Sequence, residues 1–97
     1  MIPNKIHAVV FREEEWFVAQ FLEYDIATQA GSVAALLAEA EQIIAAYILV
    51  AEQEGLEPFA NIPRAPRRFW QMYKDAKPVR HNEPLDERHP VLELRAA

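Results

Sequence analysis

Apolar and polar residues alternate in two short segments near the start of the chain. Residues 6–11 (IHAVVF) and 16–21 (WFVAQF) are rich in β-branched and aromatic side chains, and the polar residues 12–15 separate them. Two such segments joined by a short polar loop are typical of an antiparallel β-hairpin. Apolar side chains fall on both faces of both segments, so we expect the hairpin to be covered on both sides.

A third strand and a long helix are predicted next. Residues 26–30 (IATQA) follow the polar connection LEYD and form a weaker strand pattern. Ser32 is a typical N-cap, because its hydroxyl accepts a hydrogen bond from an otherwise unpaired amide of the first turn. A helical repeat of apolar residues predicts a helix over 33–54, about 33 Å long, that ends at Gly55. Its broad apolar side would cover one face of the sheet.

The far side of this helix is poor in charge. It carries small or apolar side chains at four positions, Ala35, Ala38, Ala46 and Leu49. Alanine at these positions reflects either high helix propensity or the close approach of a partner helix. The apolar run 33–51 also contains Glu39, Glu41 and Gln42. A membrane-spanning helix needs about 20 nearly uncharged residues, so we expect a soluble helix and no membrane partner.

The C-terminal part of the chain has a different pattern. A linker rich in proline leads to an amphipathic segment over about 66–76, with aromatic side chains on one side and basic ones on the other. Pro66 suits the first helical position, and the helix would end before Pro78. Residues 77–90 carry charges and prolines without periodicity and are predicted to be irregular. The alternation in 91–95 (VLELR) is typical of an edge strand.

These elements predict an α+β fold. It would consist of a small antiparallel sheet of three, or with 91–95 four, strands packed on one long helix, together with a second short helix. Residues 1–55 would form a β-β-β-α core, and 56–97 would be an extension of the same single domain. A length of 97 residues with 52% hydrophobic content suits one compact domain.

The chain contains no cysteine, which excludes disulfides, thiolate metal sites and a cysteine nucleophile. The short apolar run near the N-terminus is interrupted by Arg12 and three glutamates, so it is not a signal-peptide pattern. Both observations favour a cytoplasmic protein.

The net charge of −5 is distributed unevenly. Residues 1–63 contain two basic and ten acidic residues, a net charge of −8, whereas residues 64–97 contain eight basic and five acidic residues, a net charge of +3. Binding to nucleic-acid phosphates needs clustered Lys and Arg, which the acidic body does not provide. The body would instead suit a basic protein partner.

Few residues suggest catalysis or metal binding. His7, His81 and His89 are far apart in the sequence and lack helical spacing, so no metal site is expected. Gly31 and Gly55 are both assigned to turns, which leaves no glycine-rich phosphate loop. We therefore expect no cofactor, no catalytic residue and no enzymatic activity.

Acidic and aromatic residues form the remaining candidate sites. Glu13, Glu14 and Glu15 would be a solvated charge run in the hairpin loop, whereas Glu23 and Asp25 could aim two carboxylates together at a strand end. A second group combines basic and aromatic side chains: Arg64, Arg67, Arg68, Trp70 and Lys74. This group could contact nucleic acid by stacking, or its aromatic rings could fill the core with the arginines at its edge.

The run WFVAQFLEYDIATQAGS at 16–32, followed by an amphipathic helix, resembles the HicB-like antitoxin family. The resemblance covers about residues 6–54, and LEYDIATQ is its most specific part. It implies a truncated ribonuclease-H-like fold without catalytic acids, in which an acidic domain binds and blocks a small basic mRNA-cleaving toxin. Family members bind operator DNA through a separate C-terminal segment. Residues 56–97 show no such motif, so the chain resembles a solitary form.

The leading hypothesis is therefore an antitoxin-type protein-binding module. Glu13, Glu14, Glu15, Glu23 and Asp25 are the predicted contacts to a basic toxin. The alternative is a stand-alone ligand- or RNA-binding regulator that uses the basic and aromatic residues of the C-terminal extension. We also expect a homo-oligomer, a dimer or larger, because one long helix can cover only one face of the hairpin. The alternative is that the second helix covers the other face within the same chain.

Overall fold

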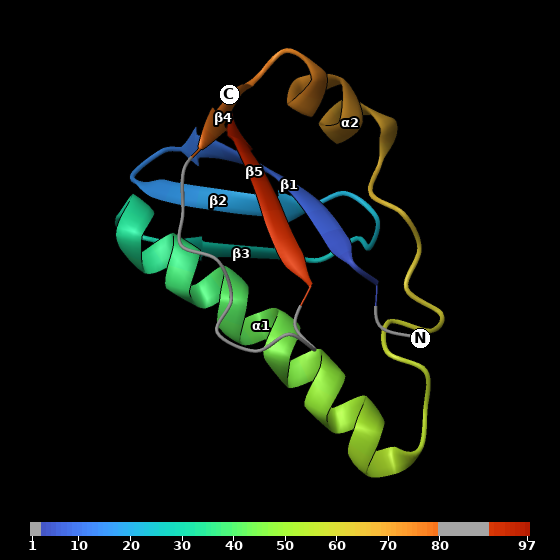
Figure 1. Cartoon of the computed structure of the whole chain (residues 1–97). Helices are drawn as coiled ribbons and strands as arrows, with labels where there is room; N and C mark the ends of the chain where they lie inside the picture. Colours follow the sequence, from blue (N-terminus) through green and yellow to red (C-terminus); the bar gives the residue numbers. More distant parts are fainter. Residues whose placement is uncertain (1–2, 80–89) are drawn as a thin grey trace.

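The computed structural model describes residues 3–79 and 90–97, which form one five-stranded sheet and two helices (Figure 1). The strands are β1 (Lys5–Glu13), β2 (Trp16–Phe21), β3 (Ala27–Ala30), β4 (Lys77–Val79) and β5 (Val91–Ala96). The helices are α1 (Val33–Glu54) and α2 (Arg67–Lys74). The strand order is β3-β2-β1-β5-β4. The fold is α+β as predicted, but the sheet has five strands rather than three or four.

The hairpin of β1 and β2 is tighter than the sequence suggested. Glu13 pairs with Trp16, so only Glu14 and Glu15 form the turn instead of a four-residue loop. Glu14 has φ 56°, the left-handed backbone that two-residue hairpin turns use. The acidic run therefore lies at the very end of the hairpin.

The C-terminal segment enters the middle of the sheet, which corrects two predictions. β5 was expected at an edge, but it lies between β1 and β4 and runs parallel to β1. β4 lies in the segment predicted to be irregular and pairs with β5 at the sheet edge. Pro78 is tolerated there because an edge strand can leave one side of its backbone without a donor. The rest of that segment, residues 80–89, lies outside the described residues.

α1 packs on one face of the sheet, mainly over β3 and β2. The main core lies on this face and includes the fully buried Phe21 and Leu36. Both predicted ends of the helix are confirmed. The Ser32 hydroxyl accepts a hydrogen bond from the amide of Ala35. Gly55 has φ 69° and donates its amide to the carbonyls of the last turn.

The other face of β1 is covered by α2, from the same chain. The Phe69 ring stacks on Phe11 at 5.9 Å, and the His7 and Tyr73 rings meet edge to face at 5.6 Å. Val9, between Phe11 and His7 on this face, is completely buried. An uncovered hairpin face was the reason for expecting self-association, and that reason does not hold. The oligomeric state itself stays a prediction.

The linker between the helices is held by ring stacking and backbone hydrogen bonds. Phe59 is buried and stacks on Tyr24 at 4.3 Å and on Tyr47 at 5.8 Å. Two amides bond across to the connection that follows β2: Asp25 donates to Pro63, and Ala65 donates to Leu22. The linker held by these contacts leads from the face of the sheet covered by α1 to the face covered by α2.

By length and composition alone, α1 is the one helix among the described residues that could cross a membrane. This is weak evidence, because core helices of soluble proteins have the same properties. Here the inner side of α1 is packed on the sheet within a compact fold.

The two glycines provide a matched test of the α1 C-cap. Neither has an atom within 4 Å of an added Cβ, but only Gly55 has a positive φ. We expect Gly55→Ala to lower the free energy of unfolding by about 1 kcal/mol, because alanine is strained in the left-handed region. Gly31→Ala should be neutral or slightly stabilising. Urea denaturation compares the two variants, and equal losses would contradict the assignment of the strain to Gly55.

Candidate functional site

His7 lies at the centre of an ionic cluster on the α2 side of the sheet. Its Nδ1 is 2.6 Å from a carboxylate oxygen of Glu23, and its Nε2 is 3.5 Å from one of Glu93. The other oxygen of Glu23 accepts the backbone amide of His7 at 2.8 Å. Only the imidazolium form of histidine carries a proton on both ring nitrogens, and that form could donate to both carboxylates.

Backbone pairing explains how these side chains meet. The parallel register of β1 and β5 places Glu93 beside His7. On the other side of β1, the amide of Leu22 donates to the His7 carbonyl, so Glu23 follows directly at the start of the connection to β3. Two carboxylates thus reach one histidine from opposite neighbours of β1.

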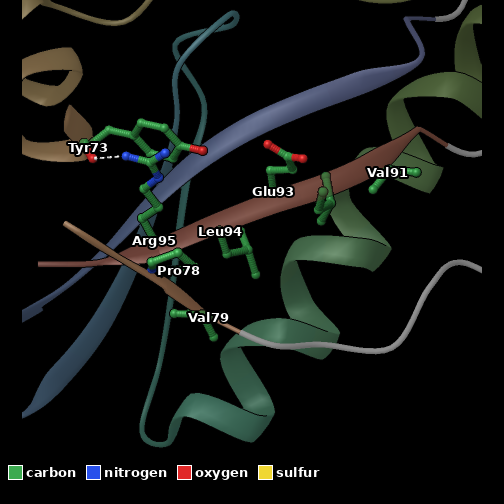
Figure 2. A pocket seen from close by; sticks show the side chains of 8 residues that line it. Tyr73, Pro78, Val79, Val91, Glu93, Leu94 and Arg95 are labelled. Atoms are coloured by element: carbon green, nitrogen blue, oxygen red, sulfur yellow. Dashed lines mark hydrogen bonds between the residues drawn. The ribbon is translucent and has the colours of Figure 1, made fainter.

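Two basic side chains extend the cluster along β5. The Lys5 ammonium lies 2.9 Å from Glu93. Arg95 packs its guanidinium over the Tyr73 ring, 4.6 Å from the centroid, and donates to the Tyr73 carbonyl at 3.4 Å. Figure 2 shows Tyr73, Glu93 and Arg95 on one side of β5 and Leu94 on the other. A pocket of about 310 Å³ lies along this strand and is lined by Tyr73, Pro78, Val79, Val91, Leu92, Glu93, Leu94 and Arg95.

These contacts shift several ionisation equilibria. The hydrogen bond from Lys5 lowers the pKa of Glu93, and the same bond raises the pKa of Lys5. Burial raises the pKa of Tyr73, and the nearby Arg95 partly opposes this shift. Burial also raises the pKa of Tyr24, next to Phe59.

The ionisable side chains of the cluster are engaged with one another. Both ring nitrogens of His7 face carboxylates, so no ring nitrogen is left to act as a base toward the pocket. The residues that line the pocket include no Ser, Thr or Cys nucleophile. Within residues 3–79 and 90–97, no group of three or more His, Asp or Glu side chains could hold a metal ion.

The predicted acidic contacts separate into two kinds. Glu13, Glu14 and Glu15 are exposed at the end of the hairpin, beside Trp16, which is itself 41% exposed. Glu23 instead binds His7.

Asp25 is exposed and accepts a hydrogen bond from the buried Gln20 side chain at 2.9 Å. Glu23 and Asp25 therefore serve different partners within the chain and do not converge on a common site.

The basic and aromatic residues lie on and just before α2. Arg64 covers the Trp70 ring at 4.3 Å, and the Trp70 indole donates to the carbonyl of Ala65 at 3.2 Å. Arg68 lies over Phe69 at 4.5 Å. A nucleic-acid base would have to displace these arginines in order to stack on the same ring faces. Arg67 and Lys74 are exposed on the same helix.

Glu93, Lys5, Arg95 and Tyr73 were not among the residues predicted from sequence. The alternation in VLELR indicates that Glu93 and Arg95 share one face of a strand, but it does not indicate which strand lies beside them. The parallel register with β1 supplies that information.

The chain matches no protein-family model, no curated protein and no solved structure. The function proposed below therefore depends on the geometry of the chain and on its sequence pattern.

The raised pKa values of Tyr73 and Lys5 predict a loss of stability at alkaline pH. A group with a raised pKa in the folded state contributes stability below its unfolded pKa, and this contribution is lost as the pH rises through the folded value. The free energy of unfolding should thus fall above about pH 10. Tyr73→Phe should make that fall smaller. Urea titrations from pH 7 to 11, with tyrosinate absorbance at 295 nm, test this, and an unchanged fall would contradict it.

Proposed function

We propose that this protein is an antitoxin-type binding module that neutralises a small basic mRNA-cleaving toxin. The resemblance of residues 6–54 to HicB-like antitoxins supports the proposal. The order of elements is compatible with the truncated ribonuclease-H-like fold that this resemblance implies. Three antiparallel strands precede α1, and a later strand returns parallel to β1.

The observation that carries the proposal is the surface at the end of the β1–β2 hairpin, formed by Glu13, Glu14, Glu15 and Trp16. An exposed tryptophan is a frequent anchor at protein interfaces, because it buries a large area with few rotatable bonds. Three exposed carboxylates next to it favour a partner with complementary positive charge. We call this surface the hairpin end.

The net charge of residues 1–63 has the same sign as the charge of the hairpin end. Residues 1–63 have a net charge of −8. Long-range attraction between opposite charges speeds association and is screened by salt, whereas apolar contacts are much less affected. The complex should therefore form more slowly at high salt, while contacts through Trp16 would mainly set its lifetime.

The partner we propose is a basic protein encoded by a short neighbouring gene. Operator DNA is not part of the proposal, because α2 is the only helix that the described residues form after α1, and it packs on the sheet of its own chain. The proposed role is that of a solitary module that binds its toxin directly.

Charge reversal of Glu13, Glu14 and Glu15 to lysine tests the proposal. We expect the rate of association with the neighbouring basic protein to fall by more than about tenfold at low salt, because steering toward the hairpin end is lost. The matched control neutralises Arg67, Arg68 and Lys74 with glutamine and should change the rate little. Stopped-flow or surface-plasmon measurements at two salt concentrations give the rates.

The same experiment distinguishes the alternative function. The exposed positive charge of α2 would favour an RNA-binding regulator. If the α2 variant abolishes binding to single-stranded RNA while the glutamate reversal affects no partner, the antitoxin proposal is wrong.

A further inference from the structure

Trp16 is the aromatic residue that the fold leaves without a partner. All ten aromatic residues of the chain lie among the described residues. Phe21 is completely buried in the core, whereas Trp16 is 41% exposed. Within residues 3–79 and 90–97, the Trp16 ring has no stacking or cation contact, and its indole N–H has no acceptor. The remaining rings each stack on another ring or lie under an arginine guanidinium: Phe11, Phe17, Tyr24, Tyr47, Phe59, Phe69, Trp70 and Tyr73.

The two strands of the hairpin place Glu13 beside Trp16. These residues are directly opposite each other in the β1–β2 register. Phe11 faces α2, and alternation along β1 puts Glu13 on the same side of the sheet. Side chains directly opposite each other on an antiparallel pair have Cβ atoms about 4.5–5.5 Å apart. A group that lies on the Trp16 ring is therefore within reach of the Glu13 carboxylate.

Arg12, the basic residue that precedes the acidic run, is engaged elsewhere. Its guanidinium lies over the Phe17 ring, 5.4 Å from the centroid, and its Nε donates to the Glu14 carbonyl at 3.1 Å. Arg12 and Phe17 are the next cross-strand pair along the hairpin, so their side chains lie on the face opposite to Trp16. Among the described residues, no ion pair engages the three glutamates of the hairpin end. The hairpin end thus combines an open ring face with carboxylates that are available to a partner.

An exposed tryptophan beside carboxylates is complementary to a cation rather than to a nucleic-acid base. The face of an indole ring is its negative region and attracts a cation that lies over it. A base stacked on Trp16 would bring its phosphates next to three glutamates, and like charges at that separation repel each other. The carboxylates therefore select the charge of the group that occupies the ring face.

The chain itself indicates which cation fits such a ring. A guanidinium is planar, so it can stack on an indole and donate two parallel hydrogen bonds to a carboxylate, whereas an ammonium group is a strongly hydrated point charge. Arg64 lies over Trp70, 4.3 Å from the ring centroid. Each of the four cation–ring contacts within the described chain is made by an arginine: Arg12, Arg64, Arg68 and Arg95.

We infer that Trp16 and Glu13 form a binding site for an arginine side chain of the protein partner. The guanidinium stacks on the indole and donates to the Glu13 carboxylate, while Glu14 and Glu15 add to the negative potential. This inference rests on the proposed function, because it concerns the same surface. It specifies the residue type by which the basic partner is recognised.

Nuclear magnetic resonance of the isotope-labelled full chain tests the arginine site. The probes are a glycine–arginine–glycine tripeptide blocked at both ends and its lysine and citrulline analogues, since citrulline has the shape of arginine without the charge. We expect the arginine peptide to shift the Trp16 indole signal saturably and to bind about threefold more tightly than the lysine peptide. The citrulline peptide should give no saturable shift. Trp70 is the internal control, because Arg64 already covers its ring, and its indole signal should not move.

Three variants separate the ring from the carboxylate, with the backbone amide signal of residue 13 as the readout. Trp16→Leu keeps an apolar side chain without a ring face, and Glu13→Gln keeps the size without the charge. Each should weaken binding of the arginine peptide about twofold or more. Trp16→Tyr is the matched control, because it keeps a ring face and should retain most of the affinity. Equal binding of the arginine and lysine peptides, or unchanged binding by Trp16→Leu, would overturn the inference.

Failure of this inference can be distinguished from failure of the proposed function. If reversal of the three glutamates slows association with the neighbouring basic protein, but Trp16→Leu changes neither arginine binding nor the lifetime of the complex, the antitoxin proposal stands and the arginine site is wrong. If the arginine peptide binds as expected but the glutamate reversal affects no protein partner, the arginine site stands and the antitoxin proposal is wrong.

Discussion

β1 has apolar side chains on both faces, and both must be removed from water. Ile6, Ala8 and Val10 face the core under α1, while Val9 and Phe11 face α2. One helix cannot cover both faces, so the chain passes around the sheet through the linker and places α2 on the opposite side. β5 then pairs with the edge of β1 that β2 leaves open. The position of α2, the ionic cluster and the pocket along β5 all depend on this double burial.

The acidic residues of the chain divide according to this architecture. Glu23 and Glu93 lie beside β1 and are bound by His7 and Lys5, so both carboxylates have partners within the fold. Glu13, Glu14 and Glu15 lie at the end of the β1–β2 hairpin, where their exposed side chains present their charge to solvent. The aromatic rings divide in the same way, since Trp70 is covered by Arg64 while Trp16 is exposed.

Local patterns predicted much of the fold because they act over a few residues. The alternation in β1 and β2, the hydroxyl of Ser32 and the left-handed preference of Gly55 are properties of short segments, and each appears where the sequence places it. β4 escaped prediction because three residues that include a proline have no periodicity of their own. The spacing of Glu23 and Asp25 would allow the two carboxylates to point together, but a histidine sixteen residues earlier binds Glu23 instead.

The amino-acid sequence by itself determined the hairpin, the long capped helix, the amphipathic character of α2 and the acidic body with its basic extension. Periodicity, capping and composition are local quantities, so they can be recognised without knowing which segments of the chain pack together. The tertiary structure alone decided that β5 lies inside the sheet parallel to β1, that His7 sits between two carboxylates, and that β3 is left as an uncharged edge. These features arise from the pairing of distant segments. Their register is set by which apolar faces can be buried together, and no short stretch of sequence contains that information.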